Sequence, residues 1–196
     1  MGSLWEGQRV RLRAVEPGDL ESFVANDEDT DGAQAGWRVH PPRSAWATGA
    51  WIEQQTQAGV DGDEFRVVIE ALATGEAVGT LNTHTCDPYA GTCSYGLAVF
   101  PWHRRHGYAS DAVVIVLRFL FGERRYQKCT VGVTSFNEAS IGLHRRLGFV
   151  EEGRVRRSHF RGGRHYDEVL LGITAEEYDS RWALPVLGEP HGPAEP

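Results

Sequence analysis

The stretch Tyr95–Ala112 constrains the fold most, because it combines a strand pattern, a tight turn and a helix pattern in direct succession. The run Leu97–Phe100 is apolar and short enough to be a buried strand. Pro101 ends this run, since proline has no N–H to give to a sheet. After Gly107, apolar residues recur at helical spacing: Ala112, Val113, Val116, Leu117 and Leu120.

The start of this helix predicts a phosphate site. The first turn of a helix offers unpaired backbone N–H groups and the positive end of the helix dipole, which together hold anions. Arg104 and Arg105 stand just before Gly107. The alternative is an ordinary strand–helix connection with solvated arginines. Two common nucleotide motifs are absent from the sequence: its single lysine, Lys128, follows no Gly-x-x-x-x-Gly, and no Gly-x-Gly-x-x-Gly follows a strand.

The net charge of −7 is strongly segregated along the chain. Residues 15–70 carry twelve acidic against three basic side chains, residues 101–165 carry thirteen basic against five acidic, and residues 166–196 carry seven acidic against one basic. Because the rest of the molecule would repel a long polyanion, we do not expect nucleic acid as a partner. A compact polyanion suits the basic middle better.

Length and composition predict a single domain over residues 1–183, with a Pro/Gly-rich, disordered tail over 184–196. No apolar run approaches the roughly 20 residues that span a bilayer, and the N-terminus does not resemble a signal peptide. Three cysteines without a Cys-x-x-Cys pair favour a reduced cytoplasm. Cys86, Cys93, His84 and His103 match no structural zinc spacing, so we expect no metal.

Alternation, helical spacing and turn residues predict an α/β sandwich with a mixed sheet. Residues 27–36 are expected to form a loop. The expected strands are 8–14, 65–72, 77–85, 93–100, 128–134, 150–160 and 166–173, and the expected helices are 16–26, 44–57, 107–121 and 137–147.

Two motifs resemble the signatures of the GNAT acetyltransferase superfamily. Residues 104–109 fit Arg/Gln-x-x-Gly-x-Gly/Ala, which is that superfamily's acyl-CoA pyrophosphate loop. Asn137, three residues before Ser140, is followed by a helix and by Leu147-Gly148-Phe149. Glu152-Gly153, together with Leu12-Arg13 and Asp19, resembles the branch of the ribosomal-protein alanine N-terminal acetyltransferases. The resemblance covers roughly residues 8–182.

This resemblance implies a GNAT-type mixed, mostly antiparallel sheet flanked by helices, in which strand 95–100 splays away from strand 128–134. Acetyl-CoA, the implied acyl donor, would lie in the opening. Asn137 would hydrogen-bond the pantetheine arm, although a simple helix cap explains it equally well. The implied cofactor-binding residues are Leu97, Val99, Arg104, Arg105, His106, Gly107, Tyr108, Ala109, Ser110 and Asn137.

The same resemblance implies the catalytic groups. Ser140 would protonate the departing thiolate, and His144, one helical turn later, stands where many members of the superfamily carry a tyrosine, so it is the second candidate donor. His159 occupies the position of a carboxylate base in related enzymes, and an imidazole can take a proton near neutral pH. Other candidate bases are Glu70, His84, Tyr95 and Asp167.

The sequence thus predicts an acyl-CoA-dependent N-acyltransferase, which transfers acetyl directly to a primary amine. The acidic first third favours a cationic acceptor, such as a protein N-terminus or a small metabolite. One alternative is a succinyl-type donor, favoured if Arg154, Arg156 or Arg157 lies at the acyl end. The other is a catalytically silent CoA-binding module. We expect no membrane partner, and a homodimer is left open.

Overall fold

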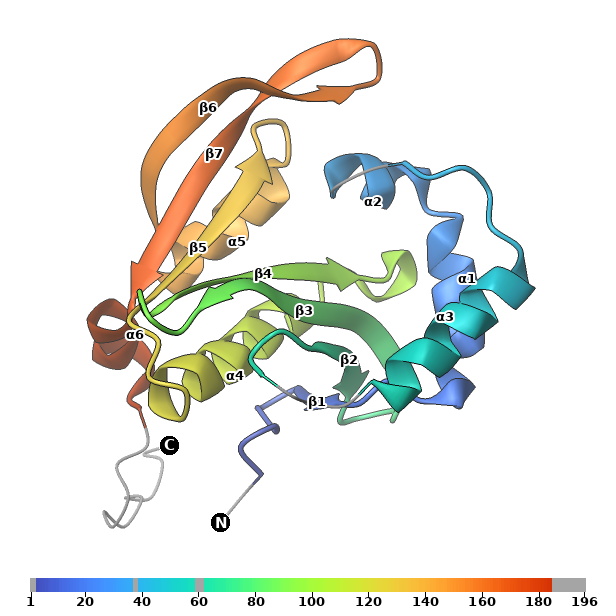
Figure 1. The fold of residues 1–196 in the computed structure, drawn as a ribbon, viewed down its shortest axis with the longest axis horizontal. Coiled ribbons are helices and arrows are strands. Elements are labelled where there is room, and N and C mark those ends of the chain that lie inside the picture. The colour runs from blue at the N-terminus through green and yellow to red at the C-terminus, as the bar shows by residue number, and fades with distance from the viewer. Residues whose placement is uncertain (1–2, 37–38, 59–61, 185–196) are drawn as a thin grey trace.

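A seven-stranded sheet in the order β1-β2-β3-β4-β5-β7-β6 forms the centre of the molecule (Figure 1). The computed structural model describes residues 3–36, 39–58 and 62–184. Neighbouring strands are antiparallel except for β4 and β5, which are parallel. The strands are β1 (Val10–Arg13), β2 (Arg66–Ala71), β3 (Ala77–Asp87), β4 (Thr92–Val99), β5 (Lys128–Thr134), β6 (Val150–Arg161) and β7 (Arg164–Thr174). This is the mixed, mostly antiparallel α/β sheet that the sequence predicts.

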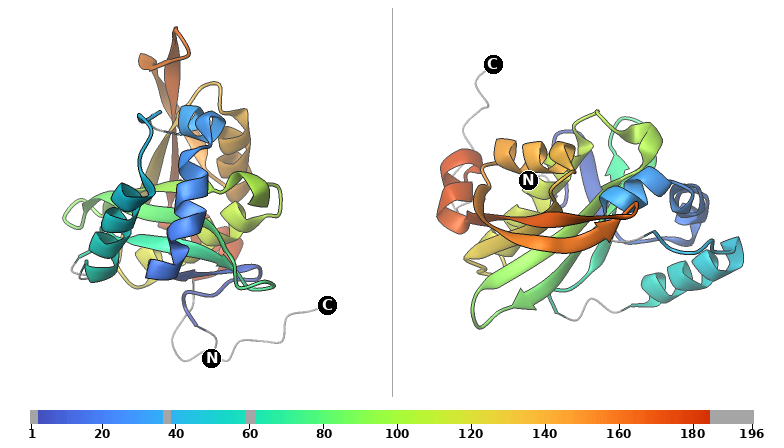
Figure 2. Two further views of the ribbon diagram at one scale, coloured as in Figure 1. Left: turned by 90° about the vertical axis from the view of Figure 1, so that its right-hand side faces the viewer. Right: turned by 90° about the horizontal axis from the view of Figure 1, so that it is seen from above.

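Helices cover both faces of the sheet, and Figure 2 shows the layers from two further sides. On one face, α4 packs on β1, β2 and β4, and it also contacts α5 and α6. On the other face, α1 and α3 pack together over a second apolar cluster. The helices are α1 (Leu20–Asp27), α2 (Thr30–Ala35), α3 (Ala45–Gln57), α4 (Tyr108–Gly122), α5 (Glu138–Leu147) and α6 (Ala175–Trp182), with short 3-10 turns at Pro17–Asp19 and Pro101–His103.

The strands β4 and β5 separate soon after they meet. They pair only at Thr92 with Lys128 and at Cys93 with Cys129. Beyond that point β4 stays paired to β3, while β5 stays paired to β7 along its whole length. The predicted splayed strand pair is therefore confirmed, and it leaves backbone groups of both strands facing an opening.

Two stretches differ from the sequence predictions. The acidic segment 27–36 contains a helix, α2, where a loop was expected. Its sequence, Thr-Asp-Gly-Ala-Gln-Ala, has little helical preference, so contacts elsewhere in the fold must stabilise it. The chain also ends its described part in α6, which was not predicted, although Thr174 and Glu177 form a capping box at its start. The expected disordered tail lies almost wholly outside the described residues.

None of the helices in the described ranges is both long and apolar enough to cross a membrane.

Candidate active site

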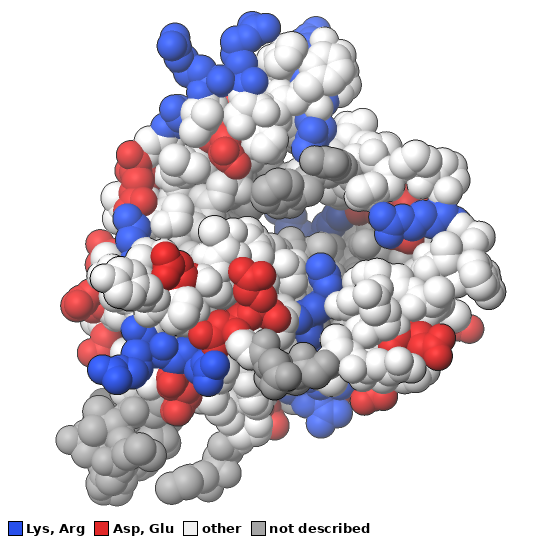
Figure 3. Space-filling model, in the orientation of Figure 1, with Lys and Arg blue, Asp and Glu red and all other residues white. Residues whose placement is uncertain are grey.

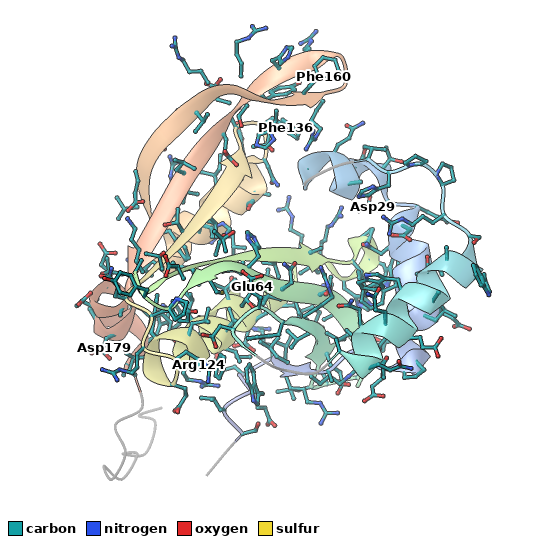
Figure 4. All side chains as sticks on the ribbon, viewed as in Figure 1. Asp29, Glu64, Arg124, Phe136, Phe160 and Asp179 are labelled. Atoms are coloured by element: carbon teal, nitrogen blue, oxygen red, sulfur yellow. The ribbon has the colours of Figure 1, made fainter. Side chains whose placement is uncertain are left out.

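A cleft of about 1400 Å³ opens between the diverging strands, and Figure 3 shows the molecule hollowed on this side. Its walls come from β4, the turn after it, the start of α4, β5, α5, α2 and the β6–β7 hairpin. In Figure 4, Asp29, one of the lining residues, lies near α2, and Phe136 lies near the end of β5. All thirteen residues that the sequence assigned to the site line this one cleft. Their individual roles remain predictions.

The turn before α4 presents a row of backbone donors to the cleft. Gly107 has φ 80° and Arg105 has φ 69°, so the backbone here passes twice through the left-handed region. In the described part of the chain, no carbonyl or side chain accepts from the N–H groups of residues 105–110. The first bond of this kind in α4 is that from Asp111 N–H to the Gly107 carbonyl, at 3.2 Å. Consecutive free donors at a helix start form an anion-binding cradle.

Helix α2 contacts both predicted cofactor motifs. The Asp29 carboxylate, one residue before α2, pairs with the Arg104 guanidinium. Asn137 donates from Nδ2 to the Ala35 carbonyl at 3.1 Å, while its Oδ1 accepts from the Ser140 N–H at 3.1 Å. Asn137 therefore caps α5, as the helix-cap interpretation predicted, and its side chain also hydrogen-bonds to the end of α2. Gly32 permits this packing, because a Cβ there would overlap the Asp29 carboxylate.

Ser140 and His144 lie one turn apart on α5, and both line the cleft. His144 Nδ1 lies 2.8 Å from the Ser140 carbonyl oxygen and 3.4 Å from Ser140 Oγ. Because a carbonyl can only accept, we assign the proton to Nδ1, which leaves Nε2 with a lone pair in the neutral ring. The Ser140 hydroxyl keeps its own proton free to donate. The arrangement favours Ser140 over His144 as a proton donor.

Two buried polar atoms in this wall have no hydrogen-bond partner among the described residues: Nε2 of His144 and the hydroxyl of Tyr95. His144 is 4% exposed and Tyr95 is 5% exposed. Their rings stack at 5.9 Å between centroids. Burial lowers the pKa of His144, against a smaller opposing effect of its bond to the Ser140 carbonyl. Burial raises the pKa of Tyr95 well above its usual value. Both groups are therefore uncharged at neutral pH.

His159 lies on the opposite wall and faces a carboxylate that sequence reasoning missed. Its Nε2 is 3.3 Å from Oε1 of Glu168 on β7. Glu168 also lies directly over Gly132 of β5, where a Cβ would meet its carboxylate. The pairing of β6 with β7 was predictable from the Gly162-Gly163 turn, but the bulge between Val155 and His159 that sets their register was not.

The remaining candidates lie elsewhere. Glu70 pairs with Arg11 and Arg13 on β1, and Asp167 accepts from the Arg157 N–H at 2.9 Å. Neither of these carboxylates, nor His84, is among the described residues that line the cleft; Tyr95 is. The three arginines that would have favoured a succinyl-type donor are exposed on β6 and are also absent from that lining: Arg154, Arg156 and Arg157.

Comparisons with known proteins agree with this geometry. The chain is 39% identical over 175 residues to the SPbeta prophage-derived uncharacterized N-acetyltransferase YokL of Bacillus subtilis, which covers 89% of this chain and 95% of that protein. It is 22% identical over 169 residues to the spermidine N(1)-acetyltransferase of Escherichia coli, covering 86% of this chain and 88% of that protein.

A solved structure has the same fold. The crystal structure of spermidine N-acetyltransferase from Vibrio cholerae in complex with CoA and spermine matches with a TM-score of 0.74 at 22% identity, over 86% of this chain and 97% of that one. The family model described as "Acetyltransferase (GNAT) domain" matches residues 9–150. The chain therefore belongs to the GNAT family and is an N-acetyltransferase.

Proposed function

We propose that this enzyme transfers acetyl from acetyl-CoA directly to a primary amine of a protein N-terminus or a small cationic metabolite. The observation that supports this most is the opening between β4 and β5, which leads to free N–H groups at residues 105–110. Such an opening suits a long cofactor arm, and such a cradle suits its diphosphate.

Acetyl-CoA is the acyl donor that the GNAT family uses, and it supplies an activated thioester. The residues present fit it. The N–H groups of 105–110 would hold the diphosphate, with Gly107 allowing close approach. Ser110 would add a hydroxyl, and the backbone of Leu97 and Val99 on the open edge of β4 would hold the arm.

His159 would remove the proton from the acceptor ammonium. The Glu168 carboxylate at 3.3 Å favours a proton on Nε2, which leaves Nδ1 of His159 as the accepting atom. The free amine then forms a bond to the thioester carbon, while the bond from that carbon to sulfur breaks. Ser140 would give its hydroxyl proton to the leaving sulfur and take up the second proton that the nitrogen loses as the amide forms, so that the hydroxyl is restored. His144 would orient Ser140 through the backbone contact at 2.8 Å.

The acceptor would enter from the acidic wall. Asp27, Glu28, Asp29 and Asp31 line the cleft, and a carboxylate wall attracts an ammonium. The spermidine acetyltransferases among the relatives support a small cationic amine. The motif resemblance to the alanine N-terminal acetyltransferases supports a protein N-terminus instead. We further expect the enzyme in the cytoplasm, which the three free cysteines support.

A thiol-release assay tests the proposal. Purified protein with acetyl-CoA should release free CoA thiol in the presence of some members of a panel that contains polyamines, amino sugars, amino acids and short peptides with a free N-terminus. Ser140→Ala should lower kcat by a factor of about 10² to 10⁴ with little change in acetyl-CoA binding. Ser180→Ala, on the exposed side of α6, is the matched control and should behave as wild type.

Calorimetry separates the rivals. Silence across the whole panel together with no acetyl-CoA binding would remove the proposal. Tight CoA binding without transfer, unaffected by Ser140→Ala and His159→Ala, would establish the silent module instead.

A further inference from the structure

Arg66 is a cation in the cleft without a counter-charge. It opens β2, lines the cleft, and is only partly exposed. Burial lowers the pKa of its guanidinium, and no carboxylate in the described ranges lies within ion-pair distance of it. Removing a charged group from water without giving it a counter-charge costs free energy. The position of Arg66 therefore suggests that an anion binds beside it.

Three acids on β2, at the end of α1 and in the turn before α2 have other partners. Glu70 lies four residues further along β2, and thus on the same face of the strand, but both of its oxygens bind Arg11 and Arg13. Asp29 binds Arg104. Asp27 accepts a hydrogen bond from the Thr48 hydroxyl at 3.2 Å. None of these three carboxylates forms an ion pair with Arg66.

The guanidinium is held in a fixed orientation. Its central carbon lies 5.4 Å from the ring centroid of Trp51 on α3, which is cation–π distance. Of its five N–H donors, one has a partner in the described structure, the Thr80 hydroxyl at 3.4 Å. The ring therefore supports one side of the group, while the fork of donors in its plane stays available to the cleft.

Asn82 extends this donor set. It pairs directly with Arg66 across β2 and β3, and with Gly96 across β3 and β4, so the three residues share one face of the sheet. Asn82 also lines the cleft, and its side-chain amide has no hydrogen bond within the described part of the chain. Gly96 leaves room, because a Cβ there would stand 3.0 Å from Asn82 Oδ1.

We propose that Arg66, with Asn82, binds a carboxylate carried by a reactant other than the coenzyme part of the donor. A planar fork of N–H donors matches a carboxylate in two parallel hydrogen bonds, and a side-chain amide can supply a third. This inference rests on the proposed acyl transfer and narrows its substrate class: the reactants include an amine and also a carboxylate.

The carboxylate lies a few bonds from the reacting centre. Arg66 is two strands from β4, which is about 10 Å at the usual strand spacing, and its side chain spans part of that distance. Two sources fit this placement. The acceptor can carry the acid, as an amino acid does, with its ammonium near the acidic wall and its carboxylate at Arg66. Alternatively, the acyl group can end in an acid, as succinyl does.

Matched substrates distinguish the sources. One arm compares ω-amino acids of increasing length with their primary amides, all with acetyl-CoA. The other arm compares succinyl-CoA with acetyl-CoA on an uncharged primary amine. In one of the two arms, the substrate that carries the carboxylate should be preferred over its uncharged analogue. Arg66→Gln should reduce kcat/KM for that substrate by about 10- to 100-fold, while kcat/KM for the uncharged analogue changes less than about threefold.

Three further measurements keep the result interpretable. Arg66→Lys retains the charge but not the fork, and should recover only part of the loss. Arg43→Gln removes a charge from an exposed arginine that also lines the cleft, and should leave the acid preference intact. Calorimetry with CoA should give wild-type affinity for Arg66→Gln, which shows that this variant folds.

The possible failures are separable. Absence of turnover with every acceptor and both donors overturns the acyl transfer itself. Turnover that is indifferent to the carboxylate in both arms, or an acid preference that survives Arg66→Gln, overturns only the role of Arg66.

Discussion

At the scale of single residues, the site depends on side chains whose charge is decided by their surroundings. His144 has no counter-ion, and its Nδ1 is committed to the Ser140 carbonyl. A buried imidazole of this kind resists protonation, since the charged form would lose its hydration. It can position Ser140, but it holds no spare proton at neutral pH to give away.

This predicts a pH-dependent stability. The pKa of His144 is lower in the folded than in the unfolded chain, so below about pH 6.5 the unfolded chain binds a proton that the folded one refuses. The free energy of unfolding should therefore fall as the pH drops through that range, by at most about 1.4 kcal/mol per pH unit from this group. Urea unfolding of wild type and His144→Gln between about pH 5 and pH 8 measures it.

The variant should show a flatter profile than wild type. His40→Gln, an exposed position, is the control and should retain the wild-type slope. Parallel profiles for wild type and His144→Gln would show that this imidazole is not the group responsible.

A second residue-scale prediction concerns the pair of His159 and Glu168. Glu168→Gln keeps the shape of the side chain but replaces the carboxylate that faces His159 Nε2 with an amide, which weakens the control of the ring tautomer. We expect kcat to fall by about 10- to 100-fold, less than for His159→Ala, with the KM for acetyl-CoA nearly unchanged. Steady-state kinetics measures both, and Glu176→Gln on the exposed start of α6 serves as control. A loss confined to acetyl-CoA binding would contradict a role in proton transfer.

At the scale of elements, local patterns sufficed wherever one face of an element packs on the core. The helix predicted at 107–121 is α4, Tyr108–Gly122, and that predicted at 137–147 is α5, Glu138–Leu147. Their starts and stops were readable because Gly107, Asn137 and Gly148 occupy the helix ends. The strand predicted at 128–134 has those same bounds.

What the sequence could not supply was placement. Helix α2 exists because Asp29 meets Arg104 and Ala35 meets Asn137, contacts about 75 and 102 residues apart in the chain. The partner of His159 and the isolation of Arg66 likewise depend on strand register and on which acids are already taken. The periodicity of residues along one segment does not show the register between strands, and it does not show which acids are already paired.

One element-scale contact invites a stability test. Asp111, in the first turn of α4, accepts from the N–H groups of Gln8, Arg9 and Val10 at 3.2, 2.6 and 2.9 Å, and so fixes β1 to the helix. Asp111→Asn removes the charge and should lower the free energy of unfolding by about 2 kcal/mol. Urea denaturation measures this loss. The control is Glu53→Gln, at an exposed carboxylate of α3 without an ion pair in the described structure, and an equal effect of both changes would refute the argument.

At the scale of the whole molecule, the basic residues of 101–165 lie in different places: a few line the cleft, and a larger group lies on the β6–β7 hairpin. Of the thirteen basic residues in 101–165, only Arg104, Arg105 and Arg146 are among the described residues that line the cleft. Five arginines lie on the β6–β7 hairpin, over which blue side chains gather in Figure 3: Arg154, Arg156, Arg157, Arg161 and Arg164. Most of the positive charge of residues 101–165 therefore lies outside the cleft.

Two ion pairs in the described structure join the acidic residues 15–70 to the basic residues 101–165: Asp63 with Arg124, and Asp29 with Arg104. Only the second pair lines the cleft. If Arg104 serves the cofactor phosphates, Asp29 competes with them for it. Asp29→Asn should therefore tighten CoA binding about two- to fivefold, the range expected for an ion pair whose arginine is 43% exposed. Calorimetry with CoA measures this gain. Asp31→Asn removes the same charge two residues further along, inside α2, without breaking an ion pair in the described structure. It therefore measures only the long-range effect of the negative charge on CoA binding. An equal gain in both variants would mean that only long-range charge matters, whereas a weaker affinity in Asp29→Asn would mean that α2 holds Arg104 in its binding position.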